Sequence, residues 1–148
     1  MASNPLVPQG TLNRVRGSLS FNDNASLNLT SSYLTDAGIS FSFEGAAVDY
    51  LPTMTGAVAS PAPYLIVTGT INLVRSQALA NAFKLQWESN PVLGDGVFLA
   101  DSSSVSAFYF NQLAITGIHE LDTTGKNPSW VITVTGYYPI ASDLWDLV

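Results

Sequence analysis

The sequence predicts a mainly β protein, an antiparallel β-sandwich or partly closed barrel with one flanking α-helix at about residues 76–90. Three observations predict this class. Most of the chain alternates between apolar and polar residues, turn-forming residues separate the alternating segments, and only one stretch has helical spacing. The 148 residues fit a single domain with a sizeable core, and neither a linker nor an internal repeat divides residues 1–148.

Alternation marks the expected strands, because successive strand residues point to opposite faces of a sheet. The alternating segments are 12–21, 39–44, 64–74, 97–100, 105–118 and 130–138. Two of them, 39–44 and 64–74, have a clearly apolar face and a clearly polar face. The residues of the two polar faces include Ser40, Ser42, Glu44, Thr68 and Thr70.

The one helical segment is 76–90, in which apolar residues recur at helical spacing from Leu79 to Trp87. Ser76 is the expected N-cap residue. Pro91 ends the segment, since the residue before a proline is disfavoured in a helix. We expect this helix to cover the hydrophobic core.

Turn-forming residues set the expected limits of several strands. Residues 22–24, Asn-Asp-Asn, predict a turn after the first strand, and residues 94–96, Gly-Asp-Gly, predict a tight turn before a short strand at 97–100. We expect a bend near Asn111 and Gln112 within the segment 105–118.

Composition excludes several kinds of function. Charged residues make up 11% of the chain and the net charge is −6, with only five Lys and Arg residues to grip a nucleic acid. The chain has no cysteine, which excludes disulfides and thiolate metal sites. No apolar run approaches the roughly 18 residues of a membrane span, so we expect no membrane partner.

Catalytic signatures are sparse. His119 is the only histidine, and Glu120 and Asp122 near it cannot complete a typical metal site. Glu44 and Asp49 could act as an acid–base pair, although any acidic protein offers such pairs. Because no nucleophile elbow or phosphate-binding loop occurs, we expect a protein that is not an enzyme and has no cofactor or metal site.

Three segments are expected to contact other subunits: an N-terminal arm (1–10), a long uncharged loop (51–63) and a C-terminal arm (139–148). Low charge density favours exposed apolar patches, which usually mark interfaces. The alternatives are that these segments pack on their own domain and that Ser, Thr and Asn make the surface polar. The expected interface residues are Leu51, Pro52, Thr53, Met54, Val58, Pro61, Leu144 and Trp145.

Three stretches of the sequence, 4–14, 51–61 and 136–140, resemble tail-tube proteins of long-tailed bacteriophages, a family related to the type VI secretion tube protein. The resemblance implies a hexameric ring, and rings that stack into the hollow tail tube of a virion. It implies that the loop 51–63 and the two arms reach neighbouring copies. Further partners would be the sheath, baseplate and tail-terminator proteins, and DNA would pass through the tube without specific binding.

The resemblance also implies that one face lines a channel. An acidic protein is suited to such a wall because it repels the phosphates of DNA. Candidate channel-facing residues are the polar-face residues Ser40, Ser42, Glu44, Thr68 and Thr70, although which sheet lines the channel stays open. Arg14 and Arg16 suit a channel poorly, so we expect them to form ion pairs with a neighbouring subunit.

Other functions remain open from the sequence alone. A tail-terminator or baseplate ring protein would share the fold and stop at a single ring. A sugar-binding β-sandwich is suggested by Trp87, Trp130 and Trp145 beside Asn-rich and Asp-rich turns, and a small hydrolase is a further alternative.

Overall fold

A computed structural model describes residues 6–10, 17–100, 106–119 and 124–145. Over these residues the protein is mainly β with one long α-helix, which confirms the predicted class. The strands are β1 (Ser18–Phe21), β2 (Leu34–Glu44), β3 (Val48–Pro52), β4 (Ala57–Pro61), β5 (Tyr64–Val74), β6 (Val92–Leu99), β7 (Phe108–Ile118) and β8 (Ser129–Pro139). The helices are α1 (Ala78–Ser89) and the short α2 (Ser142–Trp145), with 3-10 turns at Ala25–Leu27 and Ser31–Tyr33.

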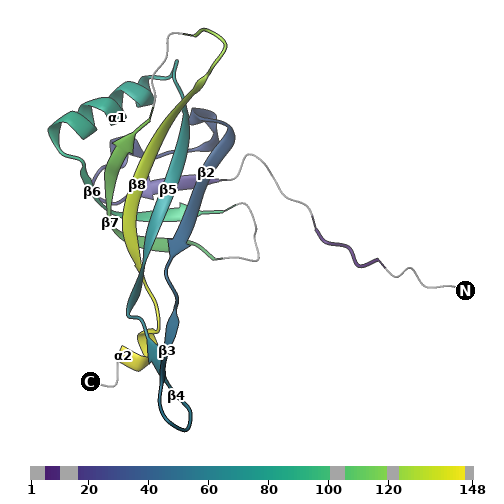
Figure 1. The fold of residues 1–148 in the computed structure, drawn as a ribbon. Coiled ribbons are helices and arrows are strands. Elements are labelled where there is room, and N and C mark those ends of the chain that lie inside the picture. The colour runs from purple at the N-terminus through teal and green to yellow at the C-terminus, as the bar shows by residue number, and fades with distance from the viewer. Residues whose placement is uncertain (1–5, 11–16, 101–105, 120–123, 146–148) are drawn as a thin grey trace, which may run out of the picture.

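Six strands form one antiparallel sheet in the order β1-β6-β7-β8-β5-β2, which curls into a half-barrel (Figure 1). The central strands β5 and β8 pair along their full length, from Tyr64 opposite Pro139 to Val74 opposite Ser129. At the first of these ends, β3 and β4 project as a separate two-stranded sheet (Figure 1). We call this the hairpin end, and we call the opposite end, where α1 follows β5, the helix end.

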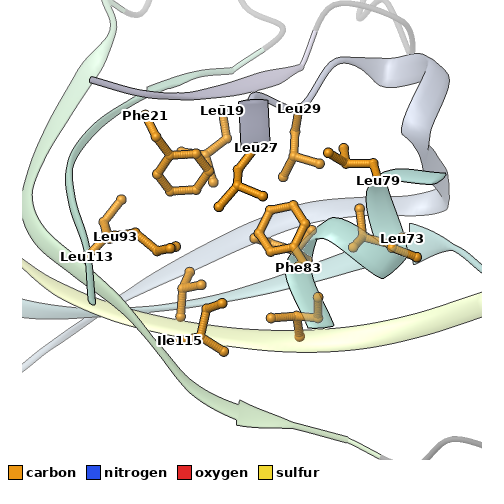
Figure 2. Close-up of a cluster of buried hydrophobic side chains, with 14 of the residues drawn as sticks. Leu19, Phe21, Leu27, Leu29, Leu73, Leu79, Phe83, Leu93, Leu113 and Ile115 are labelled. Carbon is orange, nitrogen blue, oxygen red and sulfur yellow. The ribbon is translucent and has the colours of Figure 1, made fainter. Parts of the chain in front are cut away.

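The hydrophobic core lies against one face of the curled sheet and is covered by α1, as expected (Figure 2). The Phe83 ring of α1 is fully buried and meets Phe21 edge-on at a centroid distance of 6.3 Å. Burying a side chain of this kind stabilises the fold by roughly 1.5–3 kcal/mol. The largest fully buried side chains are Phe83, Phe110, Leu19, Leu27, Leu29, Ile71, Leu73, Leu93, Leu113, Ile132, Val67 and Val134.

Aromatic rings fill the part of the core beneath β2. The Phe41 and Phe110 rings lie 4.6 Å apart between centroids, and Phe98 lies 4.9 Å from Phe41. Gly69 of β5 lies opposite Phe41 in the ladder, and a Cβ on Gly69 would overlap the Phe41 ring. Glycine therefore lets the ring lie directly against the strand, and a larger residue would force the ring to shift.

Of two predicted chain reversals or bends, the turn at 94–96 is wrong and the bend near Asn111 and Gln112 is confirmed. Gly94, Asp95 and Gly96 do not form a tight turn but lie inside β6, where the pairing with β7 shifts register twice. Gly94 adopts a φ of 85°, which glycine accommodates without strain, so these glycines serve β-bulges. The expected bend near Asn111 and Gln112 is confirmed by a register shift there and by the positive φ of Gln112.

The helix begins later than predicted. Ser76 is not the N-cap: it lies in a turn closed by a hydrogen bond from the Gln77 N–H to the Val74 carbonyl, and Gln77 holds the cap position without a side-chain bond. The end at Ser89 agrees with the expected stop before Pro91. The strand expected at 12–21 is present at Ser18–Phe21, and residues 12–16 lie outside the described residues.

Candidate assembly surfaces

The segment 51–63, predicted as a long loop, is instead part of a β-hairpin. In β3 and β4, Val48 pairs with Pro61 and Pro52 pairs with Ala57, and the Thr53 N–H donates to the Gly56 carbonyl at the tip. Pro52 and Pro61 are compatible with this hairpin because both strands of a two-stranded sheet are edge strands, which accept proline.

The hairpin is rich in apolar residues, and nearly all of its residues are exposed. Met54 at its tip is 100% exposed and Tyr50 70% exposed. Alternation and register place an entirely apolar set on one face, consisting of Val48, Tyr50, Pro52, Ala57, Ala59 and Pro61. An isolated two-stranded hairpin is only marginally stable in water, and exposed apolar patches usually mark contact surfaces. The predicted interface residues of this segment therefore share one exposed projection.

The C-terminal segment lies at the same end of the sheet. The Ile140 N–H donates to the Pro63 carbonyl at 3.0 Å, and α2 lies beside the base of the hairpin (Figure 1). Leu144 is half-exposed, whereas the Trp145 side chain lies outside the described residues. Two of the three expected contact segments thus come together, a proximity that the sequence did not predict.

The N-terminal arm is described only in part. Residues 6–10 have no helix or strand, and Leu6 and Val7 are largely exposed. Residues 1–5, together with Arg14 and Arg16, lie outside the described residues, so the ion pair expected of these two arginines stays a prediction.

Rows of hydroxyl groups cross the outward face of the sheet, the face turned away from the core. Ser40 pairs with Thr70 and Thr70 with Thr133, and in the next row Ser42, Thr68 and Thr135 follow the same order. The expected polar residues of β2 and β5 therefore share one surface. We call the two rows the hydroxyl face: Ser40, Thr70, Thr133, Ser42, Thr68 and Thr135.

Hydrogen bonds between side chains tie the hydroxyl face together. Thr68 Oγ1 donates to Glu44 Oε1 at 3.0 Å, and the hydroxyls of Thr116 and Thr135 lie 3.2 Å apart. None of the six strands of the curled sheet contains a Lys or Arg. A ligand with phosphate groups would find hydroxyls and one carboxylate here, and no cation on these strands.

Nearer the hairpin end, the outward face becomes aromatic. The Tyr64 and Tyr137 rings lie 5.6 Å apart, Ile66 pairs with Tyr137, and Tyr109 of β7 is 64% exposed. Neither this patch nor the contribution of Thr116, Thr133 and Thr135 was predicted as part of a site. The alternation in 130–138 could have indicated the two β8 threonines, because their side chains point to the face opposite that of Trp130, Ile132 and Val134.

The residues considered for catalysis do not form a recognisable centre. His119 is exposed just beyond β7, and its Nε2 lies 2.6 Å from Thr133 Oγ1. Glu44 and Asp49 lie in different sheets, and Glu120 and Asp122 are outside the described residues. Among the residues that the structure describes, no three His, Asp or Glu side chains are grouped to hold a metal ion.

No helix in the described part of the chain has the length and apolar character needed to cross a membrane. Comparison of the sequence with known protein families and with curated proteins found no match.

Proposed function

We propose that this protein is a structural virion protein of the bacteriophage tail-tube type, in which rings of six copies stack into a hollow tube. The observation that carries the proposal is the β3–β4 hairpin, which projects from the sheet with apolar residues that none of the described part of the chain buries. A surface of this kind is suited to binding another protein, and a second copy is the partner that the resemblance implies.

The hydroxyl face supports the second part of the proposal, a channel through which DNA passes. Hydroxyl groups hydrate well and carry no charge, and among the described residues Glu44 and His119 are the ionisable side chains bonded to these rows. A wall without Lys or Arg has no cations that could replace the counterions of the phosphates. DNA would therefore slide past without binding. The described residues of the proposed wall are Ser40, Ser42, Glu44, Thr68 and Thr70, now joined by Thr133 and Thr135.

Electron microscopy of the purified protein in negative stain tests the proposal. Tubes with a central hole are the expected result. Single rings would favour a tail-terminator or baseplate protein instead. A monodisperse monomer at high concentration would contradict self-assembly altogether.

A hairpin replacement tests the role of the projection. The Ala62 N–H donates to the Ala47 carbonyl at 2.8 Å, so residues 48–61 can be replaced by an Asn-Gly turn joining these two positions. We expect a folded protein that no longer forms tubes, because the curled sheet keeps all of its own strands. Normal tubes from this variant would remove the hairpin from the interface.

A sugar-binding module is the second candidate, now carried by the exposed tyrosines at the hairpin end rather than by the tryptophans. Trp130 is buried, and the Trp145 side chain lies outside the described residues, so of the three tryptophans only Trp87 is described as exposed. Titration of the monomer with glycans, followed by tyrosine and tryptophan fluorescence, would distinguish this function from assembly.

A further inference from the structure

A shallow pocket lies at the helix end, between α1 and the adjoining ends of β5 and β8. Its volume is about 200 Å³, and it is lined by Arg75, Ala80, Asn81, Lys84 and Trp130. Most of the atoms that line it are apolar, since lysine and arginine side chains carry apolar stems beneath their charges. The pocket is thus an apolar recess with a polar and cationic rim.

A projection of matching character lies at the other end of the molecule. Met54 at the tip of the hairpin is fully exposed and touches no core. The hairpin precedes Tyr64 and the pocket adjoins Val74, so the 11 residues of β5 separate the two. At about 3.3 Å per residue, that separation is roughly 35 Å. One molecule therefore cannot place its own Met54 in its own pocket.

The two ends also differ in charge. The three Lys and Arg side chains of the described residues, Arg75, Lys84 and Lys126, all belong to the helix end, where Asp36 and Glu88 also lie and Glu88 pairs with Lys84 at 2.9 Å. The hairpin end carries only acidic groups among the described residues, namely Glu44, Asp49 and Asp143. Contact between unlike ends is thus electrostatically favoured over contact between two hairpin ends.

We infer that Met54 of one copy enters the pocket lined by Arg75, Asn81 and Trp130 of a second copy, an inference that rests on the proposed function. Methionine is unbranched and adaptable, and its sulfur makes favourable contacts with aromatic rings such as Trp130. A cavity of roughly 150 Å³ can hold benzene, so a pocket of this volume is large enough for a thioether side chain.

The contact joins two different surfaces, and such head-to-tail contacts repeat from copy to copy. Such contacts either close into a ring or continue as an open filament. A contact between these opposite ends of the molecule extends along β5 and β8, and it joins one ring to the next in a tube whose axis these strands follow.

Cysteine cross-linking tests the inference directly, because the chain has no cysteine of its own. Two single variants, Met54→Cys and Asn81→Cys, are prepared with tags of different size, mixed under assembly conditions and oxidised. We expect about tenfold more mixed dimer than either same-variant dimer, since a disulfide forms only between closely placed Cβ atoms. Ser89→Cys, exposed at the far end of α1, is the matched control and should give little mixed dimer with Met54→Cys.

The alternative outcomes separate the inference from the proposed function. Tubes in the microscope without the mixed dimer would overturn the pocket as the receptor of Met54 and leave the tube intact. A dominant Met54→Cys dimer would show that hairpin ends meet each other, which also overturns the inference. Absence of both tubes and cross-links would overturn the proposed function itself.

Substitutions of Met54 provide a second measurement that does not depend on disulfide geometry. Met54→Leu keeps the volume and should retain assembly, whereas Met54→Lys should raise the protein concentration needed for assembly by about tenfold or more, because an ammonium group is costly in an apolar recess and is repelled by Arg75 and Lys84 of the same pocket. Monomer melting temperatures should be equal, since Met54 is fully exposed. Equal assembly by the two variants would overturn the inference.

Discussion

The two sheets of this protein differ in how much of their apolar surface is buried. In the curled sheet, β5 and β8 each bury most of one row of residues on the core face. In the β3–β4 hairpin, nine of the ten strand residues are exposed and none is buried. Since both sheets are rich in apolar residues, only the arrangement of the surrounding elements distinguishes the sheet with a buried face from the sheet whose residues stay exposed.

Because of this difference, we expect substitutions in the curled sheet to affect the stability of the monomer and substitutions in the hairpin to affect assembly. Changes beneath the curled sheet remove contacts within one molecule and should lower the stability of the monomer. Changes in the hairpin remove surface that water already reaches and should leave the monomer almost unchanged.

The largest effect is expected from Phe83→Ala. This side chain is fully buried beneath the sheet and contacts Phe21, so its removal leaves a cavity. We expect the free energy of unfolding to fall by about 3–5 kcal/mol, measured by urea denaturation of the monomer. A loss below 1 kcal/mol would mean that α1 does not cover the core as described.

A smaller effect is expected from Gly69→Ala. The added methyl group would overlap the Phe41 ring, and such overpacking costs about 1–3 kcal/mol. Phe41→Leu should relieve the overlap, so that the double variant is more stable than the sum of the two single changes predicts. Strict additivity in urea denaturation would contradict the close approach of the two residues.

Local patterns predicted the strands whose burial alternates cleanly. The segments 64–74 and 130–138 correspond to β5 and β8 because each strand has one face in the core and one face outward. The residues of 94–96 were misassigned, since glycine permits both a turn and a β-bulge and the choice depends on pairing with β7. Sequence periodicity therefore predicted a strand correctly where one of its faces is buried. It failed where pairing with a strand distant in the sequence determines the local conformation.

The candidate site depended even more on distant contacts. The segment 51–63 was predicted to be a contact surface, but its hairpin geometry comes from register between β3 and β4. The row Ser40, Thr70, Thr133 joins residues far apart in the sequence, and no local pattern specifies which strands are neighbours. Likewise, the bond from Ile140 to Pro63 that brings two contact segments together is a tertiary contact.

A matched pair of surface variants should show almost no effect on stability. Val58 of the hairpin and Val92 of β6 are 54% and 55% exposed, so Val58→Ser and Val92→Ser each should change the free energy of unfolding by no more than about 0.5 kcal/mol. Only Val58→Ser should weaken assembly, measured by sedimentation across a concentration series. Equal weakening by both would mean that the hairpin is not a distinct contact surface.

The smallest structural change with a functional consequence is a single charge on the hydroxyl face. Thr70→Lys should alter stability by no more than about 0.5 kcal/mol, because the lysine stem can lie along the sheet and the ammonium group can reach water. If this face lines a channel, each ring gains a circle of cations, and assembled tubes should retain short duplex DNA in a manner that weakens with salt. Ser89→Lys on α1, which lies on the opposite side of the sheet, adds the same charge and should retain much less DNA on co-sedimentation. Equal retention by the two variants would separate the hydroxyl face from the channel while leaving the hairpin's part in assembly untouched.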